Sequence, residues 1–172
     1  MSLEMDVFCL LLLIRILYQM YINREQNDHW NYFYYTIAWA CVYLFMDAIW
    51  IMNVKHLLTF SKIQSGIFNS FYFCSLAMLV CSWYVYVQKT LHSAVLKHKK
   101  ILVLTFIPLI FFIGSSLLSY WTHGLFVIDQ AGNYHRGKLL PFYFLILFAY
   151  ILYLSIKAVF LRLKTYEKIQ YK

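Results

Sequence analysis

The stretch that decides the fold is Trp121-Thr-His-Gly-Leu-Phe-Val-Ile-Asp-Gln-Ala-Gly-Asn-Tyr-His-Arg-Gly-Lys-Leu-Leu-Pro141. It is a long polar interruption between two strongly apolar runs. Its centre, Val127-Ile-Asp-Gln-Ala-Gly-Asn-Tyr134, has strand-forming residues on both sides of a Gly/Asn turn, which is the pattern of a β-hairpin. We therefore expect residues 122–138 to form a small hairpin over the ends of two apolar helices.

The rest of the chain is much more apolar than a soluble protein. Of its 172 residues, 63% are hydrophobic and 13% are charged, whereas soluble domains are about half apolar and about a quarter charged. The apolar residues also come in long unbroken runs, which must face lipid or one another. The composition predicts an all-α integral membrane protein and excludes a soluble globular domain.

Five apolar segments have the length of membrane spans: residues 5–21, 32–52, 67–87, 101–121 and 139–159. Each of the last four corresponds to about 31 Å of helix, which matches the hydrocarbon thickness of a bilayer. The prediction is a single membrane domain, residues 1–172, built as a bundle of about five transmembrane helices. The hairpin lies between the fourth and fifth helices, and a basic tail follows at residues 160–172.

The basic residues of the connectors predict the orientation. Ten of them lie in the first connector, the third connector and the tail, against four in the second and fourth connectors. The positive-inside rule then places the N-terminus outside, the C-terminus in the cytoplasm and the hairpin outside. The expected location is the plasma membrane, with the lipid bilayer as partner. This topology accounts for the net charge of +8, and nothing in the sequence favours nucleic acid.

Two charged residues, Arg15 and Asp47, fall well inside predicted spans, where each costs about 2.5 to 3.5 kcal/mol at a helix centre. One interpretation is a buried ion pair that holds the first two helices together and that a ligand breaks. The other is that Arg15 extends to the inner headgroups while Asp47 bonds to a serine or tyrosine. The second is favoured, because long basic side chains reach the headgroups readily.

The hairpin carries further candidate residues. They are Asp129, Tyr134, His135 and Arg136, which place an acid, a phenol, an imidazole and a guanidinium on one short element. Neighbouring strands would bring Asp129 near Tyr134 or His135, which suits a polar ligand. A loop that satisfies its own polar groups is the favoured alternative, because one hairpin alone makes a poor pocket.

Small and polar residues in the other spans indicate helix packing. In the third span these are Asn69, Ser70, Cys74, Ser75, Cys81 and Ser82. In the fourth span, Pro108 indicates a kink, and Gly114 with the two serines after it indicates close contact between helices.

Neither a metal site nor a cofactor nor an enzyme is expected. The four cysteines form no Cys-x-x-Cys pair, and the six histidines lack the spacing of zinc ligands. The chain also lacks a nucleophile-and-base motif. The basic connector with Lys97, Lys99 and Lys100 is a candidate for anionic lipid headgroups, although its role in setting topology explains it equally well.

Three segments carry a resemblance to a bacterial family. They are Asp47-Ala-Ile-Trp50, Asn69-Ser-Phe-Tyr-Phe73 and Gly124-Leu-Phe-Val-Ile-Asp-Gln-Ala-Gly-Asn-Tyr-His-Arg-Gly137. The pattern resembles the N-terminal membrane sensor region of signalling proteins from Gram-positive bacteria, chiefly GGDEF diguanylate cyclases and related seven-span histidine kinases. The resemblance covers nearly all of the chain, and its most specific part is Phe126 to Gly137. It adds Trp50 to the ligand or switch candidates.

The resemblance implies a membrane signal-input module that couples an extracellular or membrane cue to a cytoplasmic output. The chain has no Gly-Gly-Asp-Glu-Phe motif, so it is not itself expected to make cyclic di-GMP. We expect a truncated or stand-alone sensor whose partner is a cytoplasmic signalling domain or a second copy of the chain. The alternative is a small oligomeric transporter or channel subunit, which lacks support from an internal repeat.

Overall fold

The computed structural model of the chain describes residues 3–22, 28–55, 57–90, 99–130 and 134–170. Within these ranges it has five helices and one two-stranded antiparallel sheet. The helices are α1 (Leu3–Ile22), α2 (Asp28–Val54), α3 (Lys62–Thr90), α4 (Lys99–Thr122) and α5 (Leu140–Gln170), and the strands are β1 (Phe126–Ile128) and β2 (Tyr134–Arg136). The predicted helices and the hairpin between the fourth and fifth are confirmed.

Four helices are long and apolar enough to cross a membrane, as far as the described residues show. These segments are Leu3–Ile22, Asn31–Val54, Lys62–Thr90 and Leu140–Lys157. Within the described residues of α4 a shorter apolar helix is found, Phe106–Thr122, so four of the five predicted spans meet this criterion over the part of the chain that the structure describes. Helix α5 continues to Gln170, which makes most of the predicted basic tail helical.

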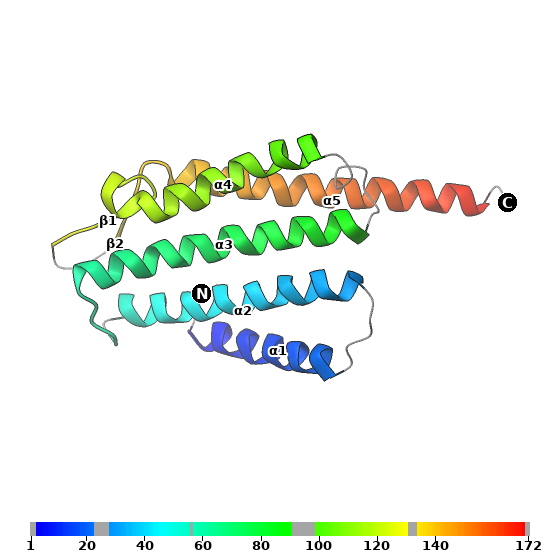
Figure 1. Ribbon diagram of the computed structural model, residues 1–172. Coiled ribbons are helices and arrows are strands. Elements are labelled where there is room, and N and C mark those ends of the chain that lie inside the picture. Colours follow the sequence, from blue (N-terminus) through cyan, green and yellow to red (C-terminus); the bar gives the residue numbers. More distant parts are fainter. Residues whose placement is uncertain (1–2, 23–27, 56, 91–98, 131–133, 171–172) are drawn as a thin grey trace.

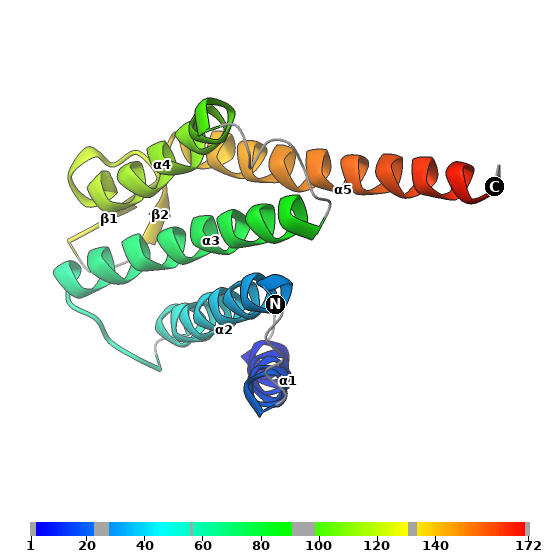
Figure 2. The same cartoon turned by 45° about the vertical axis from the view of Figure 1, so that its right-hand side comes forward.

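Helix α3 is the centre of the bundle, because it contacts α2, α4, α5 and β1. Helix α1 lies at the edge and packs mainly against α2. Figures 1 and 2 show α1 and α2 on one side of α3, and α4 and α5 on the other. The hairpin lies at one end of the bundle and the C-terminal part of α5 extends at the other.

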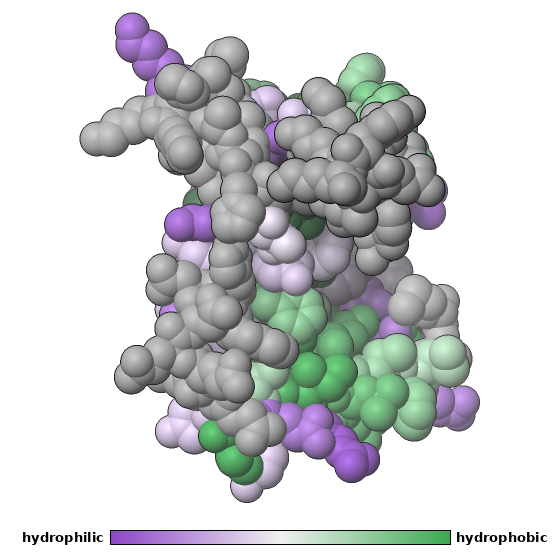
Figure 3. Space-filling view, turned by 90° about the vertical axis from the view of Figure 1, so that its right-hand side faces the viewer, coloured by the Kyte–Doolittle hydropathy of each residue, from purple (hydrophilic) through white to green (hydrophobic). Residues whose placement is uncertain are grey.

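The outer faces of the helices are apolar, as lipid contact requires. Large exposed side chains include Phe8, Leu11, Phe45, Ile110 and Phe148. The end opposite the hairpin, seen in Figure 3, also exposes hydrophobic residues among hydrophilic ones where the chain is described. The exterior therefore supports the membrane class that the composition predicted.

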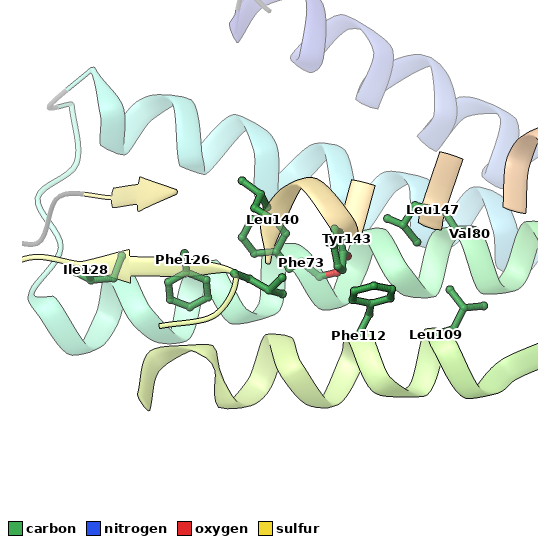
Figure 4. Packing of buried hydrophobic residues seen from close by; sticks show 10 residues of the cluster. Phe73, Val80, Leu109, Phe112, Phe126, Ile128, Leu140, Tyr143 and Leu147 are labelled. Atoms are coloured by element: carbon green, nitrogen blue, oxygen red, sulfur yellow. The ribbon is translucent and has the colours of Figure 1, made fainter. Parts of the chain in front are cut away.

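The core lies between α3, α4, α5 and the hairpin. Its buried members are Phe73, Val80, Leu109, Phe112, Leu125, Phe126, Ile128, Leu140, Tyr143 and Leu147. Phe73 stacks on Phe126 with the ring centroids 6.0 Å apart, and the Tyr143 hydroxyl donates to the Phe73 carbonyl (Figure 4). Aromatic pairs of this kind contribute about 0.5 to 1.5 kcal/mol beyond area burial. The hairpin is thus part of the core.

Close helix contact occurs at a different glycine from the one predicted. A Cβ atom at Gly114 would meet nothing within 4 Å, so this glycine makes no close contact, although the neighbouring Ser116 is fully buried and Cys74 Sγ of α3 lies 3.8 Å from the Ile113 carbonyl oxygen. At Gly66 a Cβ atom would overlap the ring of Tyr120, with Cε2 2.7 Å away. The rotation of each helix about its axis decides which glycine faces a neighbour, and a continuously apolar helix does not specify that rotation.

Candidate ligand-binding site

Helix α4 ends in a way that fixes the start of the hairpin. His123 takes a left-handed conformation, with φ of 56°, and its N–H donates to the Ser119 carbonyl over 2.8 Å, as in common helix caps. The Ser119 side chain is fully buried. Its hydroxyl oxygen accepts from the N–H groups of Leu125 (2.8 Å) and Phe126 (3.1 Å). One serine of α4 therefore satisfies two backbone donors that would otherwise be buried without a partner.

The segment after β2 packs against the start of the hairpin, at Gly124 and Leu125. The N–H of Gly137 donates to the Leu125 carbonyl, and the N–H of Leu139 donates to the Gly124 carbonyl, both over 2.9 Å. A Cβ atom at Gly137 would overlap the Gly124 carbonyl oxygen and lie 2.5 Å from the Leu125 carbonyl carbon. The two chain segments thus approach as closely as only glycine permits. This contact sets where α5 begins.

The hairpin pairs in a register that joins two of the predicted candidates. Partners across the sheet are Phe126 with Arg136, Val127 with His135, and Ile128 with Tyr134. The His135 Nε2 and Asp129 Oδ2 atoms lie 3.3 Å apart, so the predicted proximity of Asp129 to His135 is confirmed. Both side chains are exposed to solvent, 61% for His135 and 37% for Asp129. Exposed pairs of this kind contribute about 0 to 1 kcal/mol.

A cavity of about 440 Å³ lies next to the hairpin. It is lined by Trp50, Asn69, Tyr72, Phe73, Tyr134, Arg136, Gly137, Leu140, Pro141 and Phe144. These residues come from α2, α3, β2, the segment after β2, and the first turns of α5. Three predicted candidates, Trp50, Tyr134 and Arg136, are therefore brought together, and a mainly apolar cavity of this size suits a small ligand.

Aromatic rings form one wall of the cavity. The Trp50 and Tyr134 rings meet edge to face at 5.9 Å between centroids, and Trp50 stacks on Tyr72 at 6.4 Å. Burial raises the pKa of Tyr134, while the charge of Arg136 acts in the opposite direction. The Tyr134 hydroxyl is therefore protonated at neutral pH and available as a donor.

Asn69 lines the cavity and is almost completely buried. Its side chain is 1% exposed, and its amide nitrogen donates to the Ser65 carbonyl over 2.7 Å. Its Oδ1 atom has no hydrogen-bond partner within the described part of the chain. A buried polar atom without a partner costs about 1 to 3 kcal/mol. The sequence had indicated only helix packing for Asn69, yet an amide in an apolar span is itself a signal of a polar contact.

Asp47 lies near Tyr72, one of the residues that line the cavity. The hydroxyl oxygens of Tyr43 and Tyr72 are 3.2 Å apart, and the charge of Asp47 acts on both tyrosines. Arg15, by contrast, is exposed, and it forms no ion pair with Asp47 among the residues described. The hydrogen bond of Asp47 to a tyrosine, which was the favoured alternative to the ion pair, stays a prediction.

Asp6 is a further acid that the sequence did not mark. It is fully buried, and neither carboxylate oxygen has a hydrogen-bond partner in the described ranges. Its charge acts on both Asp47 and Tyr43. Nothing in the sequence indicated this burial, because the pattern around Asp6 does not show which neighbours cover it.

Replacing this acid by its amide is expected to stabilise the packing of α1. Asp6→Asn replaces a fully buried carboxyl group that has no hydrogen-bond partner among the described residues by an amide that is never charged and is less costly to bury, while the lost interaction with the helix N-terminus is worth less than about 1 kcal/mol. Amide hydrogen exchange in α1 should slow about fivefold or more, equivalent to about 1 kcal/mol. Glu4→Gln changes the same charge at an exposed position of the same turn and should not slow exchange. Faster exchange in Asp6→Asn would contradict the prediction.

Some predicted positions lie outside the described residues. These are Lys97, the side chain of Lys99, and the turn at 131–133. Lys100 is described and exposed. The prediction of lipid-headgroup contact at these lysines stays a prediction.

The chain was compared with protein-family models, with curated proteins and with solved structures, and none of the three comparisons found a match. Among the described residues there is also no group of three or more His, Cys, Asp or Glu side chains placed to hold a metal ion. The cavity next to the hairpin is therefore the site on which a functional proposal rests.

Proposed function

We propose that this chain is a membrane signal-input module that binds a small ligand in the cavity next to the hairpin and transmits its presence through α5. In this proposal the chain crosses the plasma membrane with the hairpin outside and the C-terminus in the cytoplasm. The output is a cytoplasmic signalling domain or a second copy of the chain. The chain acts as a sensor and not as an enzyme.

The observation that carries the proposal is the position of α5. Its first turns supply Leu140, Pro141 and Phe144 to the cavity wall, and the same helix runs to Gln170 at the opposite end of the bundle (Figure 1). Near that end, Lys157 Nζ donates to the side-chain oxygen of Gln88 in α3 over 2.7 Å. One continuous helix therefore joins the cavity to the far end, where its position relative to α3 is fixed by a polar contact.

A ligand shifts such a system only if it binds one arrangement more tightly than the other. The cavity wall is shared by α2, α3, β2 and α5, so a ligand that fills it changes how α5 sits against its neighbours. The resemblance of the sequence to the sensor regions of GGDEF cyclases and histidine kinases supports the same function. The positive-inside distribution of Lys and Arg supports the orientation.

Spin-label distances test the transmission step directly. Labels at Thr90→Cys in α3 and Phe160→Cys in α5, both exposed, report the separation of these helices far from the cavity. The native cysteines, Cys9, Cys41, Cys74 and Cys81, are first replaced by alanine. In lipid nanodiscs, Trp50→Ala is expected to shift the distance by about 1 to 2 Å, the usual scale of helix shifts.

The matched control is Phe148→Ala, which removes an aromatic ring from α5 that is 64% exposed and does not line the cavity. It should leave the distance unchanged. The same two variants are also fused after Lys172 to a diguanylate cyclase domain, and the cellular level of cyclic di-GMP is measured. Only Trp50→Ala should change that level relative to the parent fusion. Identical distances and identical output in all three proteins would overturn the proposal. Solute flux into vesicles containing the purified chain would favour the transporter alternative.

A further inference from the structure

We infer that the ligand of the cavity is an anionic membrane phospholipid, of the chemical type of phosphatidylglycerol. The inference rests on the proposed function, because it names the ligand of the same cavity. Two features carry it: the level of the cavity relative to the apolar span and the exposed Arg136 in its lining.

The cavity lies where an apolar span begins. Pro141 and Phe144 line it and are exposed, and the apolar segment Leu140–Lys157 starts at the same point. Across one to two helical turns, about 5 to 10 Å, the surroundings change from the polar hairpin to an apolar helix face. This is the level at which a lipid headgroup joins its acyl chains, and tryptophan and tyrosine favour that level. A lipid enters sideways with its chains along α5.

The polar ends of the cavity select the headgroup. Arg136 is exposed on β2 and lines the same cavity, and guanidinium groups bind phosphate strongly. A glycerol headgroup supplies hydroxyl donors beside a phosphate. A choline headgroup supplies no donor and places a second cation near Arg136.

Fluorescence quenching by brominated lipids measures the contact. A variant that keeps Trp50, with Trp30, Trp39, Trp83 and Trp121 replaced by phenylalanine, is placed in phosphatidylcholine nanodiscs. Each preparation contains one brominated lipid at the same fraction: brominated phosphatidylglycerol, brominated phosphatidylmethanol or brominated phosphatidylcholine. Phosphatidylmethanol keeps the anionic phosphate and lacks the hydroxyl groups. Trp50 quenching should show an apparent affinity for phosphatidylglycerol about fivefold higher than for phosphatidylcholine, the factor expected for one basic residue at the surface.

Two variants test the contact with the charged headgroup. Arg136→Gln is expected to remove the preference for both anionic lipids, whereas Lys138→Gln, which removes a neighbouring exposed charge that does not line the cavity, should keep it. Both side chains are exposed, so neither variant is expected to prevent folding.

Equal quenching by the three lipids in the parent protein would overturn the inference, as would a preference that survives in Arg136→Gln or a preference for phosphatidylcholine. The outcome is separable from that of the proposed function. If the protein shows no lipid selectivity but Trp50→Ala still shifts the spin-label distance, the chain is a sensor for another ligand. If the protein selects the lipid but Trp50→Ala leaves the spin-label distance unchanged, the cavity is a lipid site that does not signal through α5.

Discussion

Gly137→Ala is expected to lower the stability of the protein by about 3 kcal/mol, the upper range for overpacking a closely packed site. The added methyl group would overlap the Gly124 carbonyl oxygen and the Leu125 carbonyl carbon. Both are backbone atoms that no side-chain rotation can move. Relief requires separating the segment after β2 from the start of the hairpin, which breaks the bonds at Gly137 N–H and Leu139 N–H.

Thermal unfolding in detergent, followed by tryptophan fluorescence, measures the effect. A loss of about 3 kcal/mol lowers the midpoint by roughly 6 to 12 °C for a chain of this size. The matched control is Gly114→Ala, where the new methyl group meets nothing within 4 Å. Alanine inside a helix should raise stability there by about 0.5 to 1 kcal/mol. Similar midpoints for the two variants would show that the close approach at Gly137 does not constrain the fold.

Ser119→Ala is expected to cost about 2 to 4 kcal/mol. The hydroxyl oxygen of Ser119 accepts from two backbone N–H groups, those of Leu125 and Phe126, and all three residues are fully buried. Removing it leaves two donors unsatisfied, and each buried donor without a partner costs about 1 to 3 kcal/mol. The same unfolding measurement should show a lower midpoint.

Ser116 is the natural comparison, because it is equally buried in the same helix. Its hydroxyl donates to the Phe112 carbonyl one turn away over 2.7 Å, so Ser116→Ala removes a local bond and leaves no backbone donor without a partner. The expected cost is below about 1 kcal/mol. If Ser116→Ala and Ser119→Ala are equally destabilised, the hydroxyl of Ser119 has no special role in anchoring the hairpin.

The helices and the hairpin could be predicted because their signals are local. Long apolar runs predict helices in a membrane, and the Gly/Asn turn between Ile128 and Tyr134 predicts a hairpin. The contact between Asp129 and His135 also follows locally, since strand pairing brings residues on opposite strands together. Membrane insertion, orientation and the signalling role remain proposals.

The cavity could not be predicted, because it depends on how distant segments meet. Trp50 was a candidate through sequence resemblance and Tyr134 through its place on the hairpin, yet no local pattern shows that Asn69 and Phe144 share a cavity with them. The burial of Asp6 and the open space at Gly114 have the same origin. Both depend on helix rotation, which nearly uniform apolar helices leave unspecified.

The edge position of α1 has a consequence for cooperativity. Since α1 packs mainly on α2, it can separate from the bundle while α3, α4, α5 and the hairpin keep their contacts, so the chain contains two units of different local stability. No tryptophan lies in Leu3–Ile22. Fluorescence-detected unfolding therefore reports the helices that carry tryptophan, α2 among them, and senses α1 only through its contact with α2, whereas backbone exchange in α1 reports that helix directly. The two observables follow different parts of one polypeptide, and a single midpoint describes only the larger part.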